Sequence, residues 1–113
     1  MMKQKLQLTD FHTKHIHFIG IGGSGMIALV QYLRSYGKCK ISGSDLNYTS
    51  ALKDLERQGI KLYKNHAKEN ITNCNLVVYS TAIDSKNEEL EEAKKKKITC
   101  LHRSEFLNLI LAP

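Results

Sequence analysis

The sequence is poor in several features that would indicate a secreted or membrane protein. It has 113 residues with one proline, no tryptophan and three cysteines. Cys39, Cys74 and Cys100 lie far apart and form no Cys-x-x-Cys pair, so we expect small buried thiols in a reducing compartment rather than disulfides. No apolar run approaches the roughly 18 residues of a membrane span, and the N-terminus lacks the apolar middle of a secretion signal. We therefore expect a cytoplasmic protein with no membrane partner.

The positive charge of the chain does not indicate a nucleic-acid partner. The formal net charge is +6, from 17 basic and 11 acidic residues. A block of lysines, Lys94 to Lys97, directly follows a glutamate-rich stretch, and this order complements a helix dipole. Aromatic residues do not alternate with basic ones as they do in single-strand binders. The same mild positive field suits a small anionic ligand.

No cluster of metal-binding or catalytic residues stands out. His15 and His17 could share one strand face, but two histidines without a third ligand are weak evidence for a metal site. The chain also lacks the Gly-x4-Gly-Lys-Ser/Thr motif of ATP-binding loops, and Gly37-Lys38 stands at the expected end of a helix. We predict no catalytic residue, no metal site and no ATP-binding loop within this sequence.

Strand-like and helix-like segments alternate along most of the chain. Strands are predicted at 15–21, 40–45, 60–63, 76–81 and 98–101, and helices at 24–36, 49–58, from 85 onward and at 104–111. Ser85 and Glu88 fit a capping box at the start of the third helix, and Glu91–Lys95 and Glu92–Lys96 add charge pairs within it. This alternation predicts an α/β fold: a Rossmann-like, doubly wound three-layer domain with a five-stranded, mainly parallel sheet.

Four glycines occupy positions 20–25, directly after the first predicted strand, in the stretch HFIGIGGSGM. Gly20, Gly22 and Gly25 match Gly-x-Gly-x-x-Gly, with a strand before and a helix after, as diphosphate-binding turns require. The glycines allow a tight turn, close approach of phosphates and close packing of the helix on the strand. We expect the phosphates on the amides of residues 24–26; the plainer alternative is a tight turn with no ligand.

Asp45 lies 20 residues past Gly25, at the end of the second predicted strand. An acid at this position commonly accepts hydrogen bonds from ribose hydroxyls, which by itself favours a nicotinamide or flavin dinucleotide. However, the preceding Ser42-Gly43-Ser44 is small and polar where many dinucleotide folds are apolar. This difference favours a ligand that is larger or differently placed.

Several motifs occur together in an order and spacing that resemble one family. They are HFIGIGGSGM at 17–26, SGSD at 42–45, Asn65-His66, VVYSTAI at 77–83, Asn87 with Glu89-Leu90, and His102-Arg103-Ser104-Glu105. Over residues 15 to 111 the chain resembles the N-terminal domain of the Mur ligase family, in particular its alanine-adding branch. Glu88 departs from the proline that relatives often have there.

The resemblance implies the first of three domains of a peptidoglycan-synthesis ligase, with a part in cell-wall biogenesis, cell shape and cell division. In such ligases this domain holds the UDP end of UDP-N-acetylmuramate, a central domain binds ATP and Mg²⁺, and a third domain receives L-alanine. The lactyl carboxylate forms an acyl phosphate that the amine of L-alanine attacks. We therefore expect a flexible lead-in at 1–14, a UDP-sugar-binding domain at 15–113 with no cofactor of its own, and no ligation by this chain alone.

The resemblance also implies a set of substrate-binding residues. The glycine loop would cradle the diphosphate, Ser44 and Asp45 would line the nucleotide edge, and the end of the fourth strand would face the same crevice. The full set is Gly20, Gly22, Gly23, Ser24, Gly25, Met26, Ser44, Asp45, His66, Ser80, Thr81, Ala82 and Arg103. His66 and Arg103 would touch the nucleotide or an interdomain surface; the plainer interpretations are a surface loop histidine and an arginine paired with Glu105.

Two other functions stay open at this stage. One is an NAD-binding regulatory module, which would share the glycine motif and the acid after the second strand. The other is a Mur-type ligase that recycles a tripeptide and so takes a different substrate. The SGSD and STAI segments favour a ligase over the regulatory module, because a bare dinucleotide site does not need small polar residues at two strand ends.

Overall fold

The computed structural model describes residues 14–37 and 39–111, so the lead-in predicted at 1–14 lies outside the described residues except for Lys14. Five strands form one sheet in the order β3-β2-β1-β4-β5, and every neighbouring pair is parallel. The strands are β1 (His15–Ile19), β2 (Lys40–Ser44), β3 (Lys61–Tyr63), β4 (Leu76–Tyr79) and β5 (Thr99–His102). The predicted fold class is confirmed, with a sheet that is wholly parallel.

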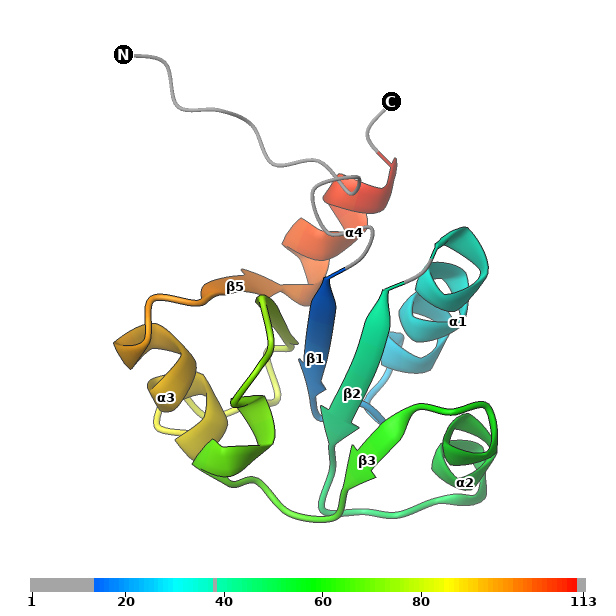
Figure 1. The fold of residues 1–113 in the computed structure, drawn as a ribbon, viewed down its shortest axis with the longest axis horizontal. Helices are drawn as coiled ribbons and strands as arrows, with labels where there is room; N and C mark the ends of the chain where they lie inside the picture. Colours follow the sequence, from blue (N-terminus) through cyan, green and yellow to red (C-terminus); the bar gives the residue numbers. More distant parts are fainter. Residues whose placement is uncertain (1–13, 38, 112–113) are drawn as a thin grey trace.

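Helices follow the strands in the alternating order that the sequence predicts (Figure 1). They are α1 (Met26–Tyr36), α2 (Ser50–Arg57), α3 (Glu88–Lys95) and α4 (Arg103–Leu111). A short 3-10 helix, η2 (Lys68–Ile71), lies in the connection from β3 to β4, and the sequence did not predict it. Among the described residues no helix combines the length and apolarity needed to cross a membrane.

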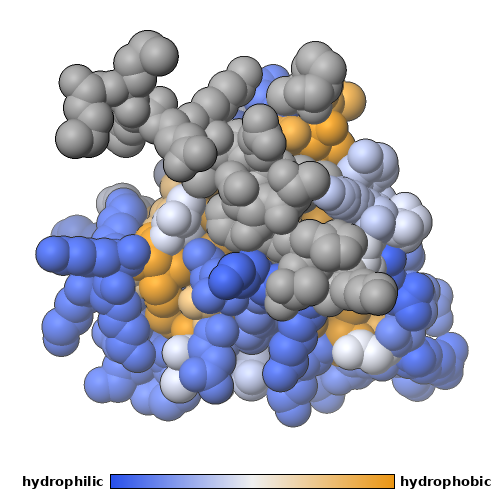
Figure 2. Space-filling view, turned by 45° about the horizontal axis from the view of Figure 1, so that its top comes forward, coloured by the Kyte–Doolittle hydropathy of each residue, from blue (hydrophilic) through white to orange (hydrophobic). Residues whose placement is uncertain are grey.

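The hydrophobic core is divided by the sheet into two layers. The larger layer joins α1, α2 and α4 to one face of the sheet, and the smaller joins α3 and η2 to the other. Successive side chains of a strand point to opposite faces, so Ile16 and Phe18 of β1 belong to the larger layer and Ile19 to the smaller. The rings of Phe18 and Phe106 meet edge to face with centroids 5.8 Å apart, which fixes α4 on the sheet. On the face drawn in Figure 2, hydrophilic side chains cover most of the coloured surface.

The start of α3 differs from the predicted capping box. The N-cap is Asn87, whose side-chain oxygen accepts hydrogen bonds from the amides of Glu89 and Leu90. Ser85 lies before the helix, in a turn closed by the amide of Asn87 and the carbonyl of Asp84. Glu88 does not reach back to Ser85; its carboxylate accepts from the amide of Lys68 at 3.3 Å and so ties α3 to η2. The predicted pair of Glu92 and Lys96 is present at 3.3 Å.

Candidate functional site

The parallel sheet brings the carboxyl ends of all five strands to one edge, and in Figure 1 the arrowheads of β1, β2 and β3 point toward the bottom of the view. Ligands of open α/β sheets bind outside these strand ends, near the point where the strand order reverses. That point lies beside β1, because β2 and β4 flank it on opposite sides. The residues that follow the strands are the glycine loop, Asp45, His66, residues 80–82 and Arg103. The structure therefore brings the predicted site segments to the same edge.

The glycine loop makes a tight turn that only glycine accommodates easily. Gly20 and Gly25 have φ values of +75° and +79°, in the left-handed region that side chains disfavour. The amides of Gly20 and Ile21 both donate to the carbonyl of Ser44, at 2.8 and 3.0 Å. The amide of Gly23 closes the turn onto the carbonyl of Gly20 at 2.8 Å. The loop is thus held by β2 on one side and by its own backbone on the other.

Two amides at the tip of this loop have no hydrogen-bond acceptor among the residues that the structure describes: those of Ser24 and Gly25. Both residues are exposed, and Gly25 is the N-cap of α1 with no side-chain cap. Open amides at the positive end of a helix dipole form a site for an anion. Met26 differs from the expectation, because its amide donates to the carbonyl of Gly23 and its side chain is fully buried.

The side chain of Arg103 lies against this loop. A Cβ placed on Gly25 would come within 3.0 Å of Nη1 of Arg103, so the guanidinium packs directly over the bare glycine. The alternative considered for Arg103, a pair with Glu105, is not formed; Glu105 instead accepts a hydrogen bond from the amide of His102 at 2.8 Å. No carboxylate among residues 14–37 and 39–111 forms a salt bridge with Arg103. Its positive charge is therefore available beside the two open amides.

Asp45 braces the glycine loop. One carboxylate oxygen accepts from the amide of Gly22 at 2.8 Å, and the other from the amide of Asn47 at 2.9 Å. A carboxylate has about four acceptor sites, so both oxygens can still accept from a ligand hydroxyl. A Cβ on Gly22 would lie 3.0 Å from Oδ2 of Asp45, which explains why glycine occurs at this position.

Ser44 and His66 belong to a polar network whose centre is Glu89, a residue the sequence prediction missed. Ser44 is fully buried and donates to Oε1 of Glu89 at 2.6 Å, while its oxygen lies 2.8 Å from Nδ1 of His66. Because the Ser44 hydrogen is directed to the carboxylate, Nδ1 of His66 must donate to Ser44. In the neutral ring, Nε2 of His66 is then an acceptor at the strand-end edge.

Glu89 carries a charge inside the smaller core layer. Its side chain is fully buried and accepts from His17, Ser44, Asn70 and the amide of Ala67. Burial alone would raise the pKa of this carboxyl, but the hydrogen bond and charge of His17 and the bonds from Ser44 and Asn70 outweigh it and lower the pKa. The carboxylate is ionised at neutral pH and fixes the donors around it.

The segment after β4 also reaches the edge. Residues 80–82 form a turn in which the amide of Ile83 donates to the carbonyl of Ser80, and Thr81 and Ala82 are exposed. The side chain of Ile83 covers Gly20, where a Cβ would meet its Cδ1 at 3.0 Å. His102, another residue missed by the sequence prediction, lies 3.0 Å from Oγ1 of Thr81 through Nε2. Among the described residues no three His, Cys, Asp or Glu side chains gather to hold a metal ion.

A wholly parallel five-stranded sheet with helices on both faces and a glycine-rich turn after its first strand defines a Rossmann-like α/β domain. Sequence comparison places the domain in a family: residues 15–113 match the family described as Mur ligase family, catalytic domain. The chain belongs to the Mur ligase family.

The curated relatives and solved structures that resemble this chain agree with the family. The chain is 51% identical over 98 residues to a UDP-N-acetylmuramate–L-alanine ligase of Campylobacter jejuni, covering 87% of this chain and 22% of that protein. A UDP-N-acetylmuramate-alanine ligase structure from Thermotoga maritima superposes with a TM-score of 0.81 at 28% identity, covering 87% of this chain and 23% of that one. A murein peptide ligase from Psychrobacter arcticus gives a TM-score of 0.69 at 25% identity, covering 77% and 18%. The chain spans about a fifth of the length of the curated relatives it matches.

Proposed function

We propose that this chain is the domain that holds the UDP part of UDP-N-acetylmuramate in an ATP-dependent ligase that adds L-alanine during peptidoglycan synthesis. The observation that carries the proposal is the set of open amides at Ser24 and Gly25 with the unpaired guanidinium of Arg103 over Gly25. A diphosphate at this position would receive backbone hydrogen bonds, the helix dipole and a charged donor together. The identity of 51% to an alanine ligase supports the choice of substrate.

The nucleoside would extend from the diphosphate along the strand ends toward β2 and β3. Asp45 would accept from a ribose hydroxyl, and Nε2 of His66 would accept a proton donor of the sugar or base. Residues 80–82 would line the side of the crevice beside β4, with the Thr81 hydroxyl held by His102. In this proposal Ser44 acts through His66, because it is itself buried.

The remaining chemistry would belong to parts of the protein outside this chain. We propose that ATP, Mg²⁺ and L-alanine bind to further domains, because residues 15–113 supply the sugar-nucleotide site and contain no ATP-binding loop. Such a reaction uses cytoplasmic ATP and a UDP-linked sugar, so we place it in the cytoplasm. The domain's own contribution is binding and orientation of the substrate.

The proposal is tested by following backbone amide resonances of this chain during titration with UDP, UDP-N-acetylmuramate and NAD. We expect both uridine ligands to shift the amides of Ser24 and Gly25 saturably. Arg103→Met keeps the apolar stem and removes the charge, and should weaken uridine binding about tenfold, as the loss of one charged hydrogen bond implies. The matched control is Arg57→Met, an exposed arginine of α2 whose side chain is 68% exposed.

Four results would contradict the proposal. Binding of NAD with no response to either uridine ligand would support a dinucleotide module instead. Uridine binding that is equally strong in Arg103→Met and Arg57→Met would remove Arg103 from the site. Shifts confined to residues away from the glycine loop would place the diphosphate elsewhere. Preference of the complete protein for a tripeptide over L-alanine as the amine joined to UDP-N-acetylmuramate would favour the recycling ligase.

A further inference from the structure

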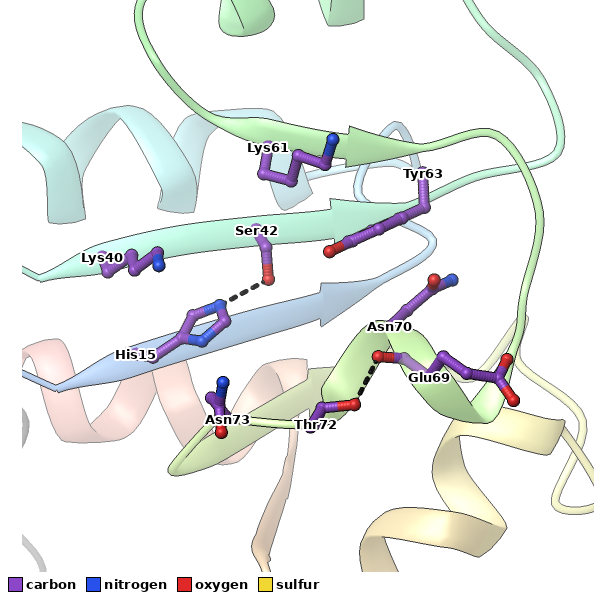
Figure 3. Close-up of a pocket in the computed structure, with 9 residues that line it drawn as sticks. All are labelled: His15, Lys40, Ser42, Lys61, Tyr63, Glu69, Asn70, Thr72 and Asn73. Carbon is purple, nitrogen blue, oxygen red and sulfur yellow. Dashed lines mark hydrogen bonds between the residues drawn. The ribbon is translucent and has the colours of Figure 1, made fainter.

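A cleft lies on the sheet face opposite α1 and α2, away from the glycine loop. It has a volume of about 320 Å³ and lies between the strands β1 to β3 and the η2 segment (Figure 3). Lys40, Ser42 and His15 point into it from β2 and β1, and the Tyr63 hydroxyl points back toward Ser42 from the end of β3. The volume is at the lower end of that of small-molecule sites, so the cleft fits a small ligand rather than a protein surface.

The charge on the cleft is predominantly positive. Lys40 and Lys61 line it, and no carboxylate among the described residues forms a salt bridge with either ammonium. Lys61 Nζ lies 5.4 Å from the ring centroid of Tyr63, which holds it over this part of the sheet. The one acid in the lining is Glu69 of η2, and its carboxylate points away from His15 (Figure 3).

One ring nitrogen in the cleft lacks a partner. Nδ1 of His15 is buried and makes no hydrogen bond, unlike the other buried side-chain nitrogens and oxygens of the described residues. The other nitrogen, Nε2, lies 2.7 Å from Oγ of Ser42, which also lies 2.7 Å from Nδ1 of His17. His17 in turn contacts Glu89 at 2.8 Å through Nε2. A single chain of hydrogen bonds therefore runs from the cleft to the buried carboxylate.

When the rings of His15 and His17 are both neutral, the direction of each hydrogen bond in this chain follows from Glu89. An ionised carboxylate only accepts, so Nε2 of His17 carries the hydrogen. In the neutral ring, Nδ1 of His17 accepts from the Ser42 hydroxyl, and the Ser42 oxygen accepts from Nε2–H of His15. Nδ1 of His15 then carries a lone pair and is buried in the wall of the cleft. When His15 gains a proton, Nδ1 becomes a donor, and the ring places a positive charge in the lining of the cleft.

We propose that this cleft binds a phosphate group of a small molecule, held by Lys40, Lys61 and the protonated His15. Lysine ammonium groups bind phosphate as point charges, and the Tyr63 hydroxyl and Asn73 amide offer neutral donors to the remaining oxygens. The tetrahedral oxyanion can accept from several donors around it, which a planar carboxylate does less well. This site is separate from the proposed diphosphate site, because its lining comes from the sheet face and η2 rather than from the strand ends.

Binding in the cleft should change the titration of His15. Burial lowers the pKa of this imidazole, and the charges of the neighbouring His17 and Lys40 lower it further. The backbone of Asn73 raises the pKa, because it can accept a hydrogen bond from the protonated ring. Lys61 and Glu69 also face the cleft from β3 and η2. A phosphate dianion in the cleft stabilises the imidazolium through its charge and should therefore raise the pKa of His15.

The test uses the whole chain and inorganic phosphate at constant ionic strength, with chloride and citrate as comparison anions. We expect saturable shifts of the His15 ring and Tyr63 resonances, a raised His15 pKa in phosphate, and a weaker effect of citrate. Lys40→Gln with Lys61→Gln should reduce phosphate affinity at least tenfold. The control is Lys53→Gln with Lys94→Gln, which removes the same charge from exposed positions of α2 and α3.

The outcomes separate this site from the glycine loop. Phosphate binding at the cleft that persists in Arg103→Met but is lost in the Lys40 and Lys61 variant supports the proposal. Equal phosphate affinity in the two double lysine variants overturns it, as does a His15 pKa that phosphate and chloride affect equally. Shifts at Ser24 and Gly25 without shifts at His15 also overturn it, while leaving the uridine site intact. A stronger response to citrate than to phosphate would assign the cleft to carboxylates.

Discussion

His17 and Glu89 form a contact of 2.8 Å between Nε2 and Oε1, and neither side chain is exposed to solvent. They come from β1 and α3, 72 residues apart in the sequence. The same carboxylate accepts from Ser44 of β2 and from the amide of Ala67 before η2. One buried charge therefore joins the central strands to the helix layer, and its Oε1 lies 3.9 Å from Nδ1 of His66.

Replacing Glu89 with glutamine should destabilise the domain strongly. The four groups around this side chain are all donors, so the amide nitrogen of a glutamine would face at least one of them without an acceptor. Removing one partner of a buried ionic network costs about 3–5 kcal/mol. Chemical denaturation of Glu89→Gln and of Glu91→Gln, an exposed neighbour on the same helix, measures the difference. Equal stability of the two variants would show that the network contributes little.

The same carboxylate should make stability fall in acid. Its pKa is lowered in the folded state, so the folded protein binds fewer protons than the unfolded chain near the ordinary glutamate pKa of 4.5. Its contribution is complete above that value and is lost as the pH falls toward the folded pKa. Denaturation at several pH values between about 6 and 3 should give a steeper fall for the unmodified chain than for Glu89→Gln. If the free energy of unfolding falls equally steeply with pH in both proteins, the acid sensitivity comes from other carboxylates.

The sequence allowed the fold to be predicted more completely than the site. Strand and helix order depend on local apolar patterns and on glycine positions. The predicted ends lie within two residues of those observed, except that α3 begins three residues after position 85. The glycine loop was predictable because backbone geometry there restricts the residue type. Glu89 was not, because it stands among three other glutamates in a helix whose charge order has a local explanation. Only the three-dimensional pairing with β1 distinguishes it from its exposed neighbours.

The position of the Arg103 side chain could not be predicted from the sequence either. Its neighbour Glu105 offered a local partner, and sequence spacing could not decide between that pair and a position over Gly25. The structure decides it through packing, since Phe106 anchors α4 on Phe18 and so places Arg103 at the loop. The cap of α3 is a comparable case, because Ser85 and Asn87 both precede the helix and the turn at Asp84 selects Asn87.

A matched pair of variants tests this cap. Asn87→Ala removes the acceptor for the amides of Glu89 and Leu90 and should cost about 1 kcal/mol. Ser85→Ala should change the free energy of unfolding by less than about 0.5 kcal/mol, because Ser85 is exposed and lies outside the helix. Urea denaturation of both variants measures the costs. A larger effect of Ser85→Ala would restore the capping box that the sequence predicts.

Gly43 should tolerate no side chain. It lies in the central part of β2, and a Cβ there would meet the side chain of Ile21 at 2.5 Å from Cδ1 and 2.7 Å from Cβ. Relief of this clash needs movement of the backbone after β1, so Gly43→Ala should cost 1–3 kcal/mol or more. Adding Ile21→Val should recover only part of the loss, because Cβ and Cγ2 of residue 21 remain close. Thermal unfolding of the single and double variants checks both steps, and full recovery would contradict the contact geometry.

Gly25→Ala tests whether the glycine loop serves binding as well as folding. Residue 25 has a φ of +79°, so alanine introduces about 1 kcal/mol of backbone strain, and its Cβ would lie 3.0 Å from Nη1 of Arg103. Gly59→Ala is the matched control: its φ is +97°, but a Cβ there meets nothing within 4 Å. Both variants should lose similar stability, while only Gly25→Ala should weaken uridine nucleotide binding, because it displaces the guanidinium from the open amides. Calorimetric titration with UDP alongside urea denaturation separates the two effects. Equal UDP affinity in both variants would mean that Arg103 and the loop tip do not act together.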